Sequence, residues 1–343
     1  MTKKVTIEDL YVEDLVKGVA KKMNVLCLEE HNITKLTIPD DIGSGFLKAT
    51  QFASGLGILE TSYNFKEDFV IEMEKHKVNP LKFVFNLGDK FYHKFNQEAT
   101  FEGIDKYSGA IIGSSIDKHH SFKIPKNKNI VIFSLELNRN LFEHKLKSFK
   151  FDLNDDLNTL LRDVKAINPF FFKYLFGAEI FELINKITTN KKKGFIGSLY
   201  KEGLTYSILS DTLETYLGEK HSEHLHNLSV EDVDTVLEIS DFIEENLSEL
   251  PTIDVIANNH LLSETKIQKI FKDYYNCSVH DFIRNKRLTE VRELLEKTNF
   301  SIGEIADKVG ILSNSYLSKI FKERYGVSPS KYRGSRLSKV RFY

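Results

Sequence analysis

One stretch of sequence occurs twice in the C-terminal third of the chain. Residues 263–275 read SETKIQKIFKDYY, and residues 313–325 read SNSYLSKIFKERY. A short segment that favours a helix precedes each copy, TIDVIA from Thr252 and SIGEIA from Ser301. Each unit therefore predicts a short helix, a turn and a longer helix. Solenoid repeats need about three or more copies to bury a core, so two copies favour two DNA-reading heads on one body.

The charge of the chain also divides at this repeat. From residue 260 to the end there are 17 Lys and Arg against 9 Asp and Glu, a balance of +8. The other 259 of the 343 residues carry 31 Lys and Arg against 40 Asp and Glu, a balance of −9. A basic end on an acidic body indicates a nucleic-acid-binding region. The length predicts two or three domains.

The remaining bulk features indicate a cytoplasmic protein. Cys27 and Cys277 lie far apart and outside any zinc-ligand spacing, which favours reduced thiols. No apolar run approaches the roughly 18 residues of a membrane helix, and the N-terminus lacks a signal-peptide core. We therefore expect no membrane, no metal and no cofactor.

Short strands dominate the first half of the sequence. After a helix at residues 8–22, turn residues separate six expected strands, at 35–38, 57–65, 69–74, 81–87, 110–116 and 129–137. This spacing predicts an antiparallel sandwich or barrel. From residue 138 the apolar spacing becomes helical, with Asn154 as a helix cap. We expect domains at 1–138 (β-rich) and 139–220 (helical), a polar linker at 221–231, and a helical domain at 232–336.

Both longer helices of the repeat have one apolar face and one polar face. Ile267, Ile270 and Phe271 are spaced to seat the first helix, and Leu317, Ile320 and Phe321 the second. Ser263 and Ser313 stand at the expected N-caps, and Gly310 in the turn where a left-handed residue is common. In the first turn, Asn258–Asn259–His260 takes that place. The opposite faces carry side chains that can reach bases and phosphates: Thr265, Gln268, Lys269, Lys272, Asn314, Ser315, Ser318, Lys319 and Lys322.

Residues 232–333 resemble the DNA-binding domain of the AraC/XylS family of bacterial transcription regulators. The resemblance lies in RLTEVRELLEKT from Arg287, in SIGEIADKVGI from Ser301 and in SNSYLSKIFKERYGVSPSKYR from Ser313. Ile311 departs from it, because the family usually has an aromatic residue there. The resemblance implies base contacts by Thr265, Gln268, Lys269, Ser315, Ser318 and Lys319, and phosphate contacts by Lys272, Lys322 and Arg333.

The family plan implies a multidomain α+β fold. A cupin-like β-rich barrel would bind a small-molecule effector, a helical region would form a homodimer, and an all-α domain would hold two helix-turn-helix motifs joined by a helix. Partners would be double-stranded promoter DNA and RNA polymerase, with activation the commoner outcome. Residues 198–214 are similar to a helix of the siderophore-responsive pyochelin regulators, which suggests a similar dimer architecture.

Candidate effector and dimer residues come from the apolar pattern of the first 220 residues. Phe83 and Phe85 share one face of a strand, and with Tyr92 and Tyr107 they could line a barrel for an apolar effector or simply pack a core. Nearby lysines such as Lys82 could receive an anionic effector or form the wet face of the strand. The dimer candidates lie along one helix and are Leu199, Tyr206, Leu209 and Leu213.

Two alternatives to an effector-responsive regulator remain open. One is a DNA-binding regulator without a ligand, controlled by a partner protein or by its own expression level. The other, more remote, is an enzyme with a DNA-binding tail. Adjacent His119 and His120 would point to opposite faces of a strand, unlike the ligands of a cupin iron site. Acidic neighbours would raise the pKa of Cys27. We therefore expect no catalytic residues.

Overall fold

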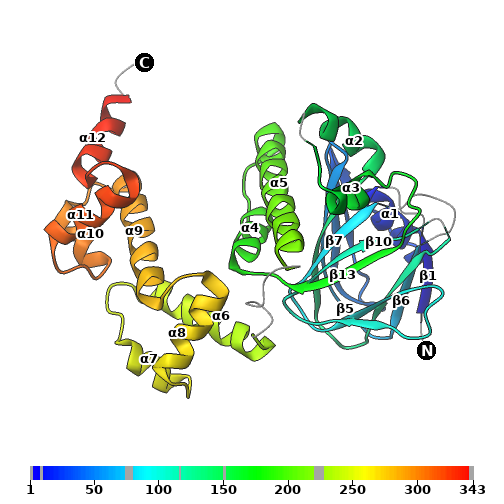
Figure 1. Cartoon of the computed structure of the whole chain (residues 1–343), viewed down its shortest axis with the longest axis horizontal. Coiled ribbons are helices and arrows are strands. Elements are labelled where there is room, and N and C mark those ends of the chain that lie inside the picture. Colours follow the sequence, from blue (N-terminus) through cyan, green and yellow to red (C-terminus); the bar gives the residue numbers. More distant parts are fainter. Residues whose placement is uncertain are drawn as a thin grey trace. The chain divides into compact units, whose positions relative to one another are not determined.

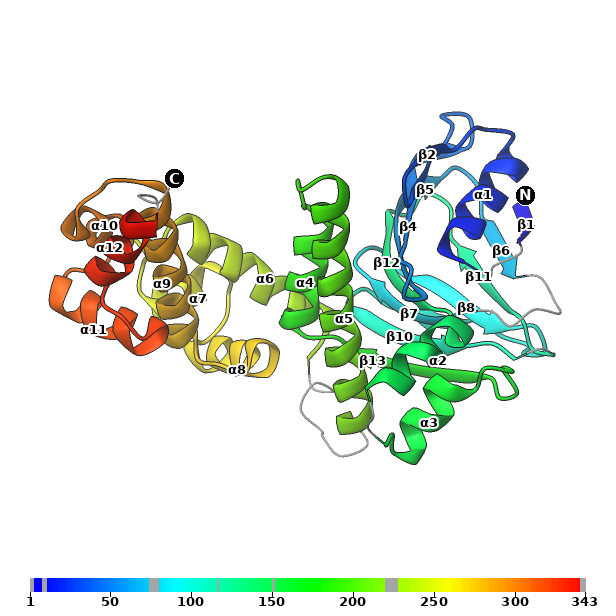
Figure 2. The ribbon, with the colours of Figure 1, turned by 90° about the horizontal axis from the view of Figure 1, so that it is seen from above.

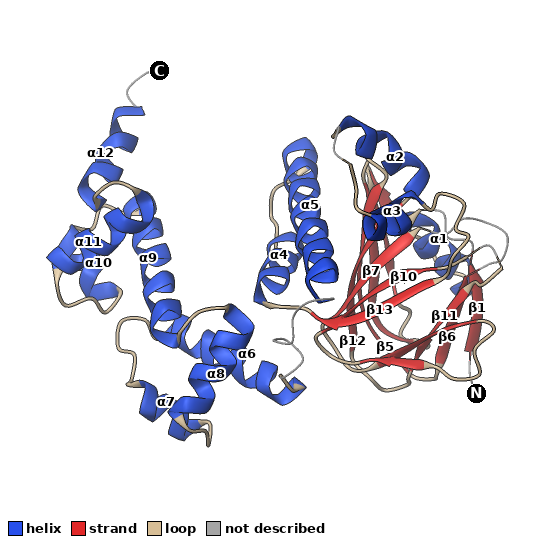
Figure 3. Ribbon diagram, in the orientation of Figure 1, coloured by secondary structure: helices blue, strands red, loops and turns tan. Residues whose placement is uncertain are grey.

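The chain consists of two compact units, Met1–Glu223 and His224–Tyr343. They are coloured blue to green and yellow to red in Figure 1. The computed structural model describes residues 3–7, 11–73, 80–115, 117–149, 152–219 and 228–339. In these ranges the first unit combines sheets with helices and the second contains only helices (Figure 3). The boundary falls in the predicted linker at 221–231, of which residues 221–227 lie outside the described ranges.

The strands of the first unit form two sheets. The five-stranded sheet has the order β1 (Lys3–Ile7), β6 (Phe69–Met73), β11 (His120–Ile124), β8 (Phe91–Phe95) and β9 (Glu102–Ile104). The eight-stranded sheet has the order β13 (Phe170–Leu175), β10 (Ser108–Gly113), β7 (Leu81–Asn86), β12 (Ile130–Leu137), β5 (Leu56–Phe65), β4 (Gly43–Gln51), β3 (Ile33–Thr37) and β2 (Leu28–Glu30). Only the pair β1–β6 is parallel among these described strands.

The main core of this unit contains residues from both sheets and from one helix. Period-2 alternation turns Phe91 of β8 and Ile71 of β6 into the same cluster as Leu59 and Val84 of the other sheet. Helix α1 (Val12–Met23) joins this cluster through an apolar stripe that includes Leu15. Figure 2 shows α1 beside the strands that it contacts. The two sheets and α1 therefore form one core.

The predicted strands are present, but the cupin-like barrel expected from the family plan is not confirmed. The described strands form two open sheets rather than one continuous cylinder. Several strands were missing from the prediction, including β4, β8 and β11, and β13 lies in the region expected to be helical. The strand expected at 110–116 ends at Gly113. What holds is the coarser prediction, a β-rich first part followed by helices.

Four helices follow β12, with β13 between the second and the third of them. They are α2 (Arg139–Ser148), α3 (Asp155–Arg162), α4 (Ala178–Thr188) and α5 (Gly194–Glu219). The predicted cap Asn154 is confirmed, because its side chain accepts a hydrogen bond from the amide of Leu157 at 2.9 Å. Helix α5 packs against α4 and against β5 (Figure 1). Across the described ranges, we find no helix with the length and apolar character of a membrane span.

The second unit contains seven helices in its described part: α6 (Val230–Glu245), α7 (Ile253–Asn259), α8 (Glu264–Tyr275), α9 (Val279–Lys297), α10 (Ile302–Lys308), α11 (Asn314–Tyr325) and α12 (Pro329–Lys339). Each copy of the repeat folds as a short helix followed by a longer one, α7–α8 and α10–α11. Helix α9 connects the two pairs. Its Leu288, Val291 and Leu295 share a core with Leu317 and Phe321 of α11.

Candidate nucleic-acid interface

Helices α8 and α11 begin in the same way. The hydroxyl of Ser263 accepts a hydrogen bond from the amide of Lys266 at 3.2 Å, and that of Ser313 accepts one from Tyr316 at 3.3 Å. Both predicted N-caps are therefore confirmed. The other free amides of each first turn remain available to an anion such as a DNA phosphate.

The apolar stripes predicted for the two helices are buried. Ile267, Phe271, Leu317 and Phe321 are all fully buried. The opposite faces are open to solvent. The exposed residues among those predicted to bind DNA are Thr265, Lys269, Lys272, Asn314, Ser315, Lys319 and Lys322, and Ser318 is half-buried. Each helix thus presents a polar, basic face while its apolar face holds it to the unit.

Gln268 and Arg333, two further residues predicted to contact DNA, are also half-buried. The side-chain oxygen of Gln268 accepts a hydrogen bond from the amide of Val279 at 3.3 Å, which ties α8 to the start of α9. Its amide nitrogen remains as the group that could read a base. Arg333 lies in α12 and is half-buried, unlike the exposed lysines of α8 and α11.

The lysines of α8 differ in their ion pairing. Lys266 contacts Asp232 of α6 at 2.6 Å. Burial alone would raise the pKa of Asp232, but hydrogen bonds from Lys266 and Ser229 hold that pKa below its usual value. In the described ranges, no ion pair engages Lys269, Lys272, Lys319 or Lys322. Their charge is available to a partner.

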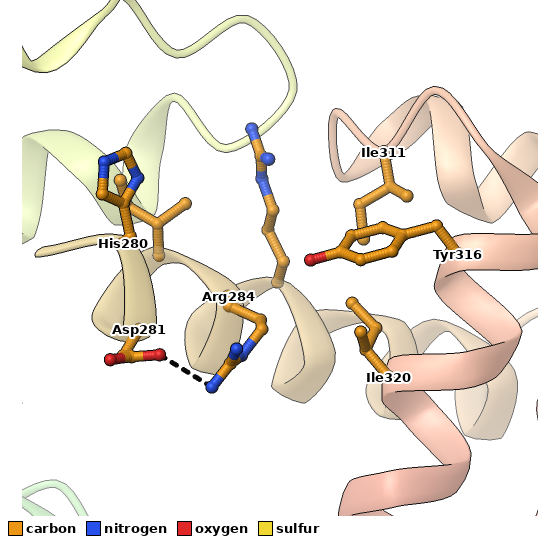
Figure 4. Close-up of a pocket in the computed structure, with 8 residues that line it drawn as sticks. His280, Asp281, Arg284, Ile311, Tyr316 and Ile320 are labelled. Carbon is orange, nitrogen blue, oxygen red and sulfur yellow. Dashed lines mark ion pairs between the residues drawn. The ribbon is translucent and has the colours of Figure 1, made fainter. Parts of the chain in front are cut away.

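Sequence reasoning missed one residue at this surface, Tyr316. It is the third residue of α11 and is 50% exposed. Its ring faces α9 across a depression of about 210 Å³, whose lining also includes His280, Arg284 and Ile320 (Figure 4). The prediction considered only short polar and basic side chains. A tyrosine among the short polar residues at the start of the second repeated helix was the sequence signal that it overlooked.

A second depression, of about 430 Å³, lies between α9 and the first helix pair. The two depressions share His280, Ile283 and Arg287 of α9, and together we call them the trough. Acidic residues along the trough are Asp254, Glu264 and Asp281. Arg284 is paired with Asp281 at 2.7 Å. The trough is therefore not a strongly cationic surface, in contrast to the exposed faces of α8 and α11.

The turns between the paired helices differ in a way that the sequence did not predict. Gly310 has φ +69°, as expected for a left-handed glycine. In the first turn the left-handed residue is Leu261, with φ 56°, and not one of the asparagines. Leu261 is 94% exposed, so its side chain adds no clash with distant residues to the local cost of the left-handed backbone. The prediction for the first turn was therefore wrong in the residue that it chose.

The helices that carry this surface are similar in sequence to a known family of protein domains. A family model described as a helix-turn-helix domain matches residues 256–335. The probable transcription factor PqrA of Proteus vulgaris is 36% identical over 81 residues, which cover 24% of this chain and 66% of PqrA. The multiple antibiotic resistance protein MarA of Escherichia coli is 30% identical over 102 residues, which cover 30% of this chain and 80% of MarA.

Among solved structures, an AraC-type transcriptional regulator from Chromobacterium violaceum is 24% identical, with a TM-score of 0.30. It covers 32% of this chain and 96% of its own. The chain spans only 66% of PqrA and 41% of a second relative, the uncharacterized regulator YfiF of Bacillus subtilis.

Proposed function

Since the chain belongs to the AraC/XylS family of DNA-binding transcription regulators, we propose that it binds promoter DNA with α8 and α11 as two heads. The observation that carries the proposal is the matched construction of these helices. Each has a serine cap, a buried apolar stripe and an exposed face with two lysines that no ion pair engages within the described part of the chain. Such a helix can enter a major groove, where side chains reach base edges and phosphates.

The proposal predicts that both heads contribute to specific binding. Replacing Lys319 with alanine should weaken specific binding by about 1–3 kcal/mol if it contacts a base, and so should replacing Lys269. Titration of a selected operator and of random DNA by fluorescence anisotropy measures both effects. Lys297→Ala is the matched control, because that lysine is exposed on α9 and pairs with Glu293.

Equal losses of affinity for operator and for random DNA would show that these lysines contact phosphates and not bases. If Lys319→Ala weakens binding and Lys269→Ala does not, the second helix pair binds alone and the two-headed proposal is wrong.

A buried polar cluster in the first unit supports an effector-binding role for it. Lys82 of β7 and Glu136 of β12 are cross-strand partners, and their charged groups are 2.7 Å apart at 1% and 3% exposure. They line a cavity of about 40 Å³ between the sheets, together with Ser134, whose hydroxyl is buried without a hydrogen bond. Phe91 and Phe122 are among its apolar walls.

The residues predicted for the effector lie elsewhere. Phe83 and Phe85 alternate with Lys82 on β7, so they face away from this cavity, and Phe85 packs on Phe133 and Phe176. Tyr92 and Tyr107 do not line it.

The chemistry of the cavity limits the effector. The polar end carries one positive and one negative charge, so an apolar molecule with a neutral or zwitterionic polar group suits it better than a lone ion. Ordinary ligand pockets measure roughly 300–1,000 Å³, so an effector has to enlarge this cavity. Such enlargement could carry a signal to the rest of the protein.

A thermal-shift screen of small molecules tests the effector proposal. A true effector raises the melting temperature in proportion to the logarithm of its concentration above its Kd. Its effect should disappear in the double variant Lys82→Met/Glu136→Leu. A shift that persists in that variant would place the binding site elsewhere. The activation of transcription through RNA polymerase, and the link to siderophores, stay proposals that rest on the family plan.

Two alternatives can be set against this function. A regulator without an effector fits the second unit equally well, and the same screen separates the two. An enzyme with a reactive thiol is disfavoured, since burial and then Glu29 raise the pKa of Cys27. The thiol is therefore less nucleophilic than an ordinary cysteine.

We also propose that the first turns of α5 form a homodimer contact. Three apolar residues are exposed there: Phe195 at 77%, Ile196 at 60% and Leu199 at 56%. Of the other dimer candidates, Tyr206 and Leu213 are half-buried, and Leu209 is only 5% exposed. Leu209 thus packs inside its own unit.

Leu199→Asp should raise the Kd of the dimer at least about tenfold, because burying a carboxylate in an apolar contact is unfavourable. Sedimentation equilibrium over a range of concentrations measures this Kd. Ser207→Asp, on an exposed position of the same helix, is the control. An unchanged Kd for Leu199→Asp would move the dimer contact to another surface.

A further inference from the structure

The turn of the second helix pair closely approaches the loop that leads into the first pair. Gly310 lies in the turn between α10 and α11, and a Cβ atom there would be 2.5 Å from the carbonyl oxygen of Leu247 and 2.7 Å from that of Ser248. Both carbonyls belong to the loop between α6 and α7, which leads into the first pair. The backbone of one head thus touches the backbone that precedes the other.

The connecting helix takes part in the same contact through Arg287. The guanidinium of Arg287 donates a hydrogen bond to the carbonyl of Leu247 at 3.0 Å. The same Cβ atom at residue 310 would be 2.8 Å from its Nη2 atom. Leu247, Arg287 and Gly310 therefore meet in space, and we call this meeting point the junction. Burial lowers the pKa of Arg287, but an arginine stays charged at this degree of burial.

The junction supplies a constraint that α9 alone does not. Its 19 residues give a rod of about 28 Å, which sets the distance between the heads. Each head packs against its own half of α9, through Phe282 for the first and through Leu288, Val291 and Leu295 for the second. The junction adds a contact between the two halves. On DNA the rotation of one head relative to the other matters, because a shift of one base pair moves a half-site by about 3.4 Å and turns it by roughly 34°.

We propose that Arg287 is a positioning residue that sets the half-site spacing accepted by the protein. It fixes the rotation of the α10–α11 head relative to the α7–α8 head through its bond to Leu247, beside Gly310. This inference rests on the proposed binding of both heads to one duplex. It concerns the spacing between the two sequences that are read, and leaves the base preference of each head to α8 and α11.

Direct contact of Arg287 with DNA is the competing role, and the surroundings argue against it. The residue is half-buried, and its Nη2 atom is committed to Leu247. The trough in which it lies also holds Asp254 and Glu264, which would repel a phosphate, whereas Asp281 is paired with Arg284. The observed partner of Arg287 is the backbone carbonyl of Leu247 and not a group outside the protein.

Operators with altered spacing test the proposal on the full-length chain. The two half-sites of a selected operator are moved apart or together by one and two base pairs, and the Kd is measured at each spacing. For the wild type we expect a loss of at least about tenfold per one-base-pair change, the equivalent of one good base contact. For Arg287→Ala we expect a loss of about threefold or less, so that the profile flattens. Arg287→Lys, which keeps one donor for Leu247, should restore part of the dependence.

The controls separate a spacing effect from unfolding and from loss of contact. Lys319→Ala should weaken binding equally at all spacings and leave the shape of the profile unchanged. Circular dichroism melts show whether each variant is folded, and a folded Arg287→Lys decides the matter if Arg287→Ala is not. If a folded Arg287 variant shows the same dependence of Kd on spacing as the wild type, the role of Arg287 is wrong but two-headed binding is unaffected. A flat wild-type profile would overturn the two-headed binding on which it rests.

Discussion

Replacing Gly310 with valine should destabilise the second helix pair by about 3 kcal/mol, because two penalties add. The residue has φ +69°, a conformation that β-branched side chains rarely adopt. The new side chain would also meet the carbonyl oxygens of Leu247 and Ser248, which are backbone atoms and cannot turn aside. Native-state hydrogen exchange of the α11 amides measures the local stability, and DNA affinity should fall with it.

The same substitution at Gly326 provides the matched control. Gly326 also has a left-handed backbone, with φ +76°, but a Cβ atom there would meet nothing within 4 Å. Gly326→Val should therefore cost only the conformational part, about 1–2 kcal/mol. If the two variants exchange at equal rates, the close approach at the junction contributes nothing.

Removing the carboxylate of Glu136 should destabilise the first unit by about 3–5 kcal/mol, since the buried Lys82 ammonium loses its counter-charge at 2.7 Å. The change to test is Glu136→Ala, followed by urea unfolding of the full-length protein. Hydrogen exchange of the β7 and β12 amides monitors the β-rich unit separately from the helices of the second unit. The DNA-binding unit should melt as in the wild type.

The double variant Lys82→Met/Glu136→Leu distinguishes a buried charge from a packing defect. Replacing both charges with apolar side chains of similar size should be near neutral or stabilising, by up to about 4 kcal/mol. If the double variant is as unstable as Glu136→Ala, packing and not charge explains the loss. An unchanged stability of Glu136→Ala itself would show that the pair is hydrated rather than dry.

The second unit was largely predictable because its signals are local. Helical spacing, serine caps and the glycine of the second turn each depend on residues within a few positions, and the structure has them at Ser263, Ser313 and Gly310. The repeat then showed that one arrangement was used twice. The contact between Leu247 and Arg287 was not predictable, because it joins a loop carbonyl to a side chain 40 residues away.

The first unit was harder because its decisive pairings are distant. Lys82 seemed to belong to the wet face of its strand, yet it lies inside because Glu136 stands opposite in the neighbouring strand. The cavity therefore lies on the side of β7 that carries Lys82, and not on the side of Phe83 and Phe85 where it was expected. Polar interruptions such as His93 in β8 also hid a strand, although burial lowers the pKa of His93 to about 3 and keeps its ring neutral. Alternation alone cannot show which polar residues find partners.

Whether α8 and α11 read DNA sequence as two heads is decided by selecting sheared genomic DNA from the source organism on the purified full-length protein, followed by sequencing. We expect strong enrichment of a few promoter regions, each with two short sequence elements about 10–10.5 base pairs apart, centre to centre. Enrichment should fall when Lys269 and Lys319 are both replaced by alanine. Enrichment no greater than that of random fragments, or a single element read without a second, would contradict sequence-specific binding by two heads.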